Sequence, residues 1–283
     1  MSERDLAGKV FLVTGANTGI GRVTAEELGR RGARVHLASR SEEKTRPVIE
    51  AIRARGGSAE FLALDLADLG SVRRAAQSFL ATGEELHGLV NNAGLAALRG
   101  VTREGFELTF GTNHLGHFLL TTLLLPRLRA SAPSRIVNVS SKSHFRAKGI
   151  DFDALRQPMR TLTGIPEYEV SKLCNVLFTT ELARGRAGEG VRSYALHPGV
   201  IASDAWRQVP WPIRPLLTMF MKSTEDGART TLWCATSPEV AQDDGLYYDD
   251  CAPRPPSRIA EDPALARQLW ERSEAWSGTS AVG

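Results

Sequence analysis

Short apolar runs alternate with longer amphipathic segments along most of the chain. The short runs predict strands over residues 10–14, 34–38, 60–64, 88–91, 135–140 and 191–197, and a seventh strand is indicated over residues 245–249. Apolar positions at helical spacing predict helices over residues 19–29, 42–54, 69–80, 103–129, 167–186 and 263–276.

Several of the predicted strands are apolar at nearly every position, as in Val10-Phe-Leu-Val13. Strands of this kind are buried on both faces, as in a parallel sheet that helices cover on either side. Alternation of strand and helix therefore predicts a doubly wound α/β fold of the Rossmann type, with about seven parallel strands. No linker rich in proline or serine and no internal repeat interrupts the pattern, so we expect one domain over residues 1–283.

Composition is that of an ordinary globular protein, with 42% hydrophobic and 24% charged residues among 283. The formal net charge of +3 and the scattered basic residues argue against nucleic-acid binding. Three widely spaced cysteines without C-x-x-C argue against a disulfide framework and a zinc site. The first residues are polar, and no apolar stretch approaches the ~20 residues of a membrane span. We therefore expect a cytoplasmic protein without signal peptide, anchor or span.

A glycine-rich loop, Thr14-Gly-Ala-Asn-Thr-Gly-Ile-Gly21, joins the first predicted strand to the first predicted helix. Gly15 would allow a sharp turn, and Gly19 and Gly21 would allow the backbone to approach a pyrophosphate and the helix to approach the sheet. The N-terminus of the helix would present free N–H groups to the phosphates. The loop therefore predicts a dinucleotide site, with an ordinary glycine-rich turn as the alternative.

The spacing G-x-x-x-G-x-G resembles the first motif of the short-chain dehydrogenase/reductase family. Its other motifs follow in order: Asn91-Asn-Ala-Gly94, Tyr168-Glu-Val-Ser-Lys172 and Pro198-Gly199. The resemblance covers about residues 7–250 and implies a nicotinamide cofactor. The residues that it implies in cofactor binding are Gly15, Asn17, Thr18, Gly19, Ile20, Gly21, Arg40, Asp65, Leu66, Asn92, Ala93, Gly94, Tyr168, Lys172, Pro198, Gly199 and Ile201.

Three phrases resemble the retinol-dehydrogenase-like branch of that family: Asn113-His-Leu-Gly-His-Phe118, Arg135-Ile-Val-Asn-Val-Ser-Ser141 and Leu196-His-Pro-Gly199. The long segment between Ser141 and Tyr168 is similar to that branch as well. Membrane-bound members carry an N-terminal anchor, which we do not expect here. Relatives pair their two long helices, which implies a homodimer or homotetramer.

The end of the second predicted strand favours NADP(H) over NAD(H). Sites that prefer NAD usually have an acidic residue there, which binds the ribose 2′-hydroxyl. This chain has Ser39 followed by Arg40, whose guanidinium could bind a 2′-phosphate through two hydrogen bonds. A solvated surface arginine is the alternative, and Thr18 stands where many NADP-binding relatives have a second basic residue.

Tyr168 and Lys172 are four residues apart in a predicted helix and therefore project from one face. A tyrosine with the usual pKa of ~10 is a weak base at neutral pH, but a nearby ammonium and an oxidised nicotinamide both favour the phenolate. We therefore expect a lowered pKa for Tyr168. It would exchange a proton with a substrate oxygen while hydride moves between cofactor and substrate.

Ser140 and Ser141 end the fifth predicted strand, where adjacent side chains face opposite ways, so only one can point into the site. The resemblance implies that this residue is Ser141. It also implies that Asn113, in the predicted helix 103–129, is the fourth catalytic residue and holds a water that connects Lys172 to solvent. A polar residue bonded to its own backbone is the alternative for Asn113.

Histidines 114, 117, 144 and 197 come without acidic partners at ligand spacing, so we expect packed or hydrogen-bonded imidazoles and no metal site. Cys174 is expected in the core.

Two stretches, residues 142–166 and 200–224, interrupt the alternation and follow predicted strands, where ligands of open α/β sheets bind. In the family the second stretch is the variable lid over the substrate. Its apolar character predicts a lipophilic substrate, although it could instead pack on the sheet, form a subunit interface or lie on a membrane surface. Its apolar residues include Trp206, Val209, Trp211, Ile213, Leu216, Leu217, Met219, Phe220 and Met221.

The sequence thus predicts an NADP(H)-dependent oxidoreductase that interconverts a lipophilic aldehyde or ketone and its alcohol, with Tyr168 as general acid and base. The alternative is a non-catalytic NADP-binding regulatory protein with the same fold. The presence of both Tyr168 and Lys172 favours the enzyme.

Overall fold

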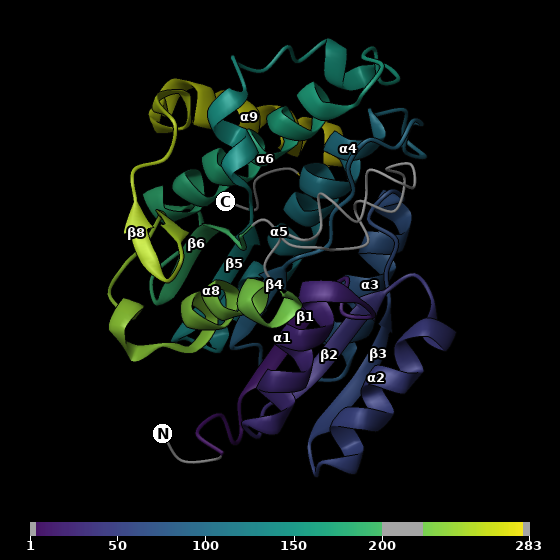
Figure 1. Ribbon diagram of the computed structural model, residues 1–283, viewed down its shortest axis with the longest axis vertical. Coiled ribbons are helices and arrows are strands. Elements are labelled where there is room, and N and C mark those ends of the chain that lie inside the picture. The colour runs from purple at the N-terminus through teal and green to yellow at the C-terminus, as the bar shows by residue number, and fades with distance from the viewer. Residues whose placement is uncertain (1–3, 200–222, 280–283) are drawn as a thin grey trace.

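The computed structural model describes residues 4–199 and 223–279. It contains one sheet with the strand order β3-β2-β1-β4-β5-β6-β7-β8 and helices on both faces (Figure 1). Neighbouring strands are parallel from β3 through β7, and β8 is antiparallel to β7. The predicted doubly wound α/β fold is confirmed.

The strands are β1 (Val10–Thr14), β2 (Arg34–Ser39), β3 (Ser58–Ala63), β4 (Gly88–Asn91), β5 (Ser134–Val139), β6 (Val191–His197), β7 (Leu246–Asp249) and β8 (Ala252–Arg254). The helices are α1 (Gly19–Arg30), α2 (Glu42–Ala54), α3 (Leu69–Ala81), α4 (Leu108–Phe110), α5 (Gly116–Ala130), α6 (Ile165–Glu181), α8 (Thr224–Thr236) and α9 (Pro263–Ser277). Among the described residues, no helix is both long enough and apolar enough to cross a membrane.

The strand order reverses between β1 and β4. After β3 the chain crosses back over β2 and β1, so that β4 pairs with β1 on the side opposite β2. Loops that follow two such strands leave in opposite directions, and a crevice opens between them at the carboxyl edge of the sheet. The glycine loop after β1 and the Asn92–Gly94 segment after β4 therefore begin side by side.

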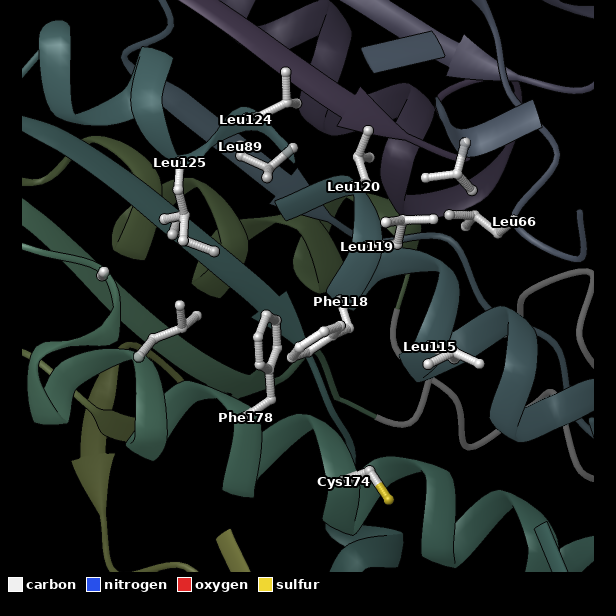
Figure 2. Packing of buried hydrophobic residues seen from close by; sticks show 14 of the residues in the cluster. Leu66, Leu89, Leu115, Phe118, Leu119, Leu120, Leu124, Leu125, Cys174 and Phe178 are labelled. Carbon is white, nitrogen blue, oxygen red and sulfur yellow. The ribbon is translucent and has the colours of Figure 1, made fainter. Parts of the chain in front are cut away.

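Apolar side chains of the central strands enter two cores, one on each face of the sheet. Leu12 and Leu89 belong to the core under α3, α5, α6 and α9, whereas Phe11 and Val13 face α1, α2 and α8. In the first core, Figure 2 shows Phe118 of α5 against Phe178 of α6, with ring centroids 5.5 Å apart. This packing fixes α6, which carries the tyrosine–lysine motif, against α5. Cys174 is buried in the same core, as predicted.

The predicted helix 103–129 begins later than its apolar spacing indicated, so the prediction over residues 103–107 is wrong. Val101 pairs with Glu107 in an antiparallel bridge, and the Glu107 carboxylate then accepts hydrogen bonds from the N–H groups of Thr109 (2.9 Å) and Phe110 (2.7 Å). A side-chain oxygen that satisfies these free donors starts a helix there. The five residues Gly111–Leu115 form a π-helical turn before α5 begins.

The sheet has one strand more than the seven expected. β7 and β8 form a hairpin around Asp250 and Cys251, whose φ angles of 53° and 61° are those of a two-residue turn of type I′. The sequence lacks the usual Asn-Gly signal of this turn, and β8 contains Pro253. Proline is tolerated in β8 because this strand lies at the edge of the sheet.

Candidate active site

The carboxyl ends of β1, β4, β5 and β6 bring the sequence motifs to one edge of the sheet. The glycine loop follows β1, Asn92–Gly94 follows β4, Ser141 follows β5 shortly after its end, and Pro198 follows β6. Ile201 and most of the predicted lid lie outside the described residues.

The glycine loop lies directly against the segment after β4. A Cβ on Gly21 would lie 2.4 Å from Nδ2 of Asn92, so only glycine allows this contact. Gly19, with a φ of +56°, has no neighbour among the described residues within 4 Å of the position of a Cβ at the N-terminus of α1. A glycine that opens the backbone to solvent at a helix N-terminus fits the pyrophosphate of a dinucleotide.

Hydrogen bonds join the two cofactor motifs into one unit. The backbone N–H groups of Asn92 and Ala93 donate to Oγ1 of Thr14 at 2.9 and 3.0 Å, and Nδ2 of Asn92 donates to the Thr14 carbonyl at 2.8 Å. The rest of the predicted loop lies at the start of α1, where Thr18 is the N-cap and Asn17 and Ile20 are partly exposed.

The ends of β2 and β3 hold the residues predicted near the adenosine half of the cofactor. Ser39 is buried and bonds the Thr45 hydroxyl at 2.6 Å, whereas Arg40 is exposed just before α2. Within residues 4–199 and 223–279, no carboxylate pairs with Arg40. Asp65 is partly exposed after β3, but the Leu66 side chain is part of the core (Figure 2).

Ser141, Tyr168 and Lys172 converge at the end of β5. The Ser141 hydroxyl lies close enough to the Tyr168 phenol to lower the pKa of that phenol as a hydrogen-bond partner. Ser140 points elsewhere and donates its hydroxyl hydrogen to the Lys172 carbonyl at 2.7 Å. The structure therefore brings Ser141, and not Ser140, to Tyr168.

The ammonium of Lys172 is buried, with only 4% of the residue exposed. Its Nζ donates to the Val139 carbonyl at 2.9 Å and lies 5.5 Å from the centroid of the Tyr168 ring. Burial lowers the pKa of Lys172 to about 8. A Cβ on Gly94 would lie 3.5 Å from Nζ, so the segment after β4 passes beside this lysine.

The structure corrects the expectation of a lowered pKa for Tyr168. Burial of the phenol raises its pKa, and the hydrogen bond to Ser141 and the positive charge of Arg146 oppose this only in part. Tyr168 is therefore protonated at neutral pH, which suits a proton donor.

Asn113 lies in the π-helical turn, and its side chain is committed to protein partners. Its Oδ1 accepts from the N–H of Leu95 at 2.9 Å, and its Nδ2 donates to the Leu95 carbonyl at 2.9 Å and to the Ser171 hydroxyl at 3.0 Å. The Asn113 side chain thus connects Leu95, which follows Gly94, to Ser171 of α6, the residue before Lys172. The water that it was expected to hold stays a prediction.

Comparison with known proteins agrees with this geometry. The family model of short chain dehydrogenases matches residues 9–151. Mouse retinol dehydrogenase 12 is 45% identical over 276 residues, which are 95% of this chain and 86% of that protein. The chain belongs to the short-chain dehydrogenase family and to its retinol-dehydrogenase-like branch.

Two solved structures are similar to this short-chain dehydrogenase. A crystal structure of an uncharacterised protein from Mycobacterium paratuberculosis is 36% identical with a TM-score of 0.79, and the match covers 99% of this chain and 97% of that one. A protein from Beutenbergia cavernae, described as an NAD(P)-dependent gluconate 5-dehydrogenase with NADP bound at low occupancy, is 27% identical with a TM-score of 0.69. That match covers 88% of this chain and 97% of the other.

Two residues of this dehydrogenase that support the site were not assigned to it from sequence. His144 Nδ1 donates to the Ser141 carbonyl at 2.6 Å, and its Nε2 accepts from the N–H of Ser257 at 3.1 Å. Arg146 pairs with Glu169, the neighbour of Tyr168, at 2.5 Å. The sequence contains no signal for these contacts, because Ser257 is 113 positions from His144 and the arginine lies in the long segment before α6.

Removing the buried charge of Lys172 should stabilise the fold. A pKa lowered from 10.5 to about 8 destabilises the folded state at every pH below 8, and the penalty disappears as pH rises to 10.5. We expect Lys172→Met to raise the free energy of unfolding by about 1–3 kcal/mol at pH 7. The gain should shrink at pH 10, and turnover should be lost.

Urea unfolding at both pH values measures this effect. Lys148→Met, at an exposed lysine of the segment before α6, is the control and should show no pH-dependent gain. A Lys172→Met gain of equal size at pH 7 and pH 10 would mean that packing, and not charge burial, is its cause.

Proposed function

We propose that this dehydrogenase is an NADP(H)-dependent oxidoreductase that interconverts a lipophilic aldehyde or ketone and its alcohol. The observation that carries the proposal is the convergence of the Ser141 hydroxyl, the Tyr168 phenol and the buried ammonium of Lys172 at the end of β5. Two hydroxyls in contact can both bond to one carbonyl oxygen.

The cofactor, Ser141, Tyr168 and Lys172 each have a different part in this reaction. A bound nicotinamide supplies or accepts the hydride. Ser141 donates a hydrogen bond to the carbonyl oxygen and orients it, while Tyr168 transfers its phenolic proton to that oxygen as the alkoxide forms. In the reverse direction Tyr168 accepts the proton of the alcohol. Lys172 stabilises the transient phenolate, because its ammonium lies near the ring.

Three features support NADP(H) as the cofactor. The position of the usual acidic residue holds Ser39, whose hydroxyl is turned inward to Thr45. Arg40 extends from the same strand end, exposed and unpaired with any carboxylate of the described residues. The structurally similar protein from Beutenbergia cavernae is described with NADP.

The substrate class rests on composition and kinship. Residues 200–222 carry many large apolar side chains and follow Gly199 at the end of the site. Pockets lined in this way bind lipophilic molecules. Similar proteins are named retinol dehydrogenases, and retinol is a lipophilic alcohol. A homodimer or homotetramer stays a prediction.

Tyr168→Phe tests the mechanism. It removes only the proton donor, so the fold and NADPH binding should persist while kcat for an aldehyde falls by ~10²–10⁴-fold. Turnover is followed by NADPH absorbance, and NADPH affinity by titration. Tyr247→Phe is the matched control, because its buried hydroxyl has no partner among the described residues. Near-normal turnover of Tyr168→Phe would refute the mechanism, and NADPH binding without turnover of any carbonyl would favour the regulatory alternative.

Arg40→Ala tests the cofactor preference. Loss of a charge-assisted hydrogen bond costs about 1.5–3 kcal/mol, so the Kd for NADPH should rise roughly ten- to a hundredfold, with little change for NADH. Arg55→Ala, at the opposite end of α2, is the control and should leave both affinities unchanged. Tighter binding of NADH than NADPH by the wild type would contradict the assignment.

A series of aldehydes of increasing chain length tests the substrate class. Each buried methylene contributes about 0.8 kcal/mol, so kcat/KM should rise roughly threefold or more per carbon until the pocket is full. Trp206→Ala or Phe220→Ala should flatten this trend without weakening NADPH binding. If short polar carbonyls were the better substrates throughout, the lipophilic assignment would fall while the oxidoreductase assignment stood.

A further inference from the structure

His117 of α5 is buried between the two cofactor motifs and the turn that carries Asn113. Its Nε2 lies 2.8 Å from Oγ1 of Thr14, and its Nδ1 lies 3.0 Å from the backbone carbonyl of Asn113. Only 2% of the residue is exposed.

The partners determine the tautomer of His117. A carbonyl oxygen can only accept, so Nδ1 carries the hydrogen that is donated to Asn113. Thr14 Oγ1 already accepts the N–H groups of Asn92 and Ala93. The Thr14 hydroxyl hydrogen then goes to Nε2, at 2.8 Å, in preference to the Val90 carbonyl at 3.4 Å.

The result is one directed chain of hydrogen bonds. It runs from the backbone N–H groups of Asn92 and Ala93 through the Thr14 hydroxyl and the His117 ring to the Asn113 carbonyl. Each donor in such a chain is polarised by the one before it. The chain ends on a carbonyl, which has no hydrogen to pass on, so it holds groups in place and does not relay protons.

The chain is intact only while His117 is neutral. If His117 became protonated, Nε2 would carry a hydrogen and would have to donate it to Oγ1 of Thr14. That oxygen already accepts hydrogen bonds from the N–H groups of Asn92 and Ala93. Burial, together with the nearby charge of Lys172, lowers the pKa of His117 to about 4, although the hydrogen bond to the Asn113 carbonyl opposes this shift. His114, one turn away, is also buried, and burial lowers its pKa to about 3. Both imidazoles therefore stay neutral at the pH at which the enzyme would work.

We propose that His117 is a positioning residue that sets the nicotinamide end of the cofactor site against the catalytic residues. Its neutral ring fixes the Asn92–Gly94 segment relative to Asn113, because it bonds to Thr14 on one side and to the Asn113 carbonyl on the other. Asn113 in turn bonds Leu95 and Ser171. The distance between Gly94 and Lys172 thus depends on a histidine that touches neither substrate nor cofactor. This inference rests on the proposed function, because it concerns the same site.

Two variants interrupt the chain at different links. His117→Phe keeps the ring and removes both hydrogen bonds. Thr14→Val keeps the shape of the side chain and removes the hydroxyl. Each should lower kcat by at least tenfold at saturating NADPH and aldehyde, and should weaken NADPH binding several-fold. Because both break one chain, the double variant should be little worse than His117→Phe alone.

Replacements that keep part of the hydrogen bonding should have a higher kcat than His117→Phe and Thr14→Val. His117→Asn places an amide donor near the position of Nδ1 and should recover part of the turnover. Thr14→Ser keeps the hydroxyl and should recover most of it. His114→Phe is the matched control: this histidine is equally buried, lies next to Asn113 and bonds Ser273 of α9 instead. It should lower the melting temperature without lowering kcat.

Nitrogen-15 NMR of histidine-labelled wild type tests the chain without any variant. The His117 signals should show a protonated Nδ1 and an unprotonated Nε2 that do not titrate above pH 5. A protonated Nε2 would overturn the proposal, as would a His117→Phe variant that keeps wild-type kcat and NADPH affinity and loses only thermal stability. Additive losses in the double variant would also overturn it.

These tests separate the inference from the proposed function. If the wild type binds NADPH but reduces no carbonyl, the proposed function fails. The His117 tautomer and the effect of both variants on NADPH affinity would still decide the positioning role.

Discussion

A buried ammonium that donates a hydrogen bond to a backbone carbonyl is the constraint on which the site depends. Lys172 lies inside the protein, where a charge is costly, and its bond to the Val139 carbonyl ties α6 to the end of β5. Since Ser141 follows β5 and Tyr168 is one helical turn before Lys172, the same bond brings the two hydroxyls together. The bond that holds the destabilising charge of Lys172 thus also brings together the residues that we propose to be catalytic.

The second constraint is the reversal of strand order between β1 and β4. It places two loops from distant parts of the sequence in contact, and Thr14 joins them through both its hydroxyl and its carbonyl. Glycines at the contact remove the side chains that would separate the loops. The contact between these two loops is therefore a result of topology, and hydrogen bonds to Thr14 maintain it.

Neutral histidines connect the site to the rest of the fold. His117 joins the cofactor motifs to the π-helical turn, and His144 joins Ser141 to the segment before α9. Each donates from Nδ1 to a carbonyl and accepts at Nε2, so one ring satisfies two groups of opposite kind. Burial keeps both rings neutral because it lowers the pKa of each. An imidazole suits this bridging role because it is rigid and spans two backbone segments.

The sequence by itself determined the fold class, most element bounds and the motifs of the site. Apolar runs and glycine spacing are local signals, and they do not depend on what packs against them. Only the tertiary structure decided the start of the helix at Leu108, the strand β8, the raised pKa of Tyr168 and the partners of His117 and His144. Each of these depends on desolvation or on hydrogen bonds between residues far apart in the chain. Such contacts leave no periodic pattern in the sequence, and the balance between burial and charge at Tyr168 can be judged only where its neighbours are known.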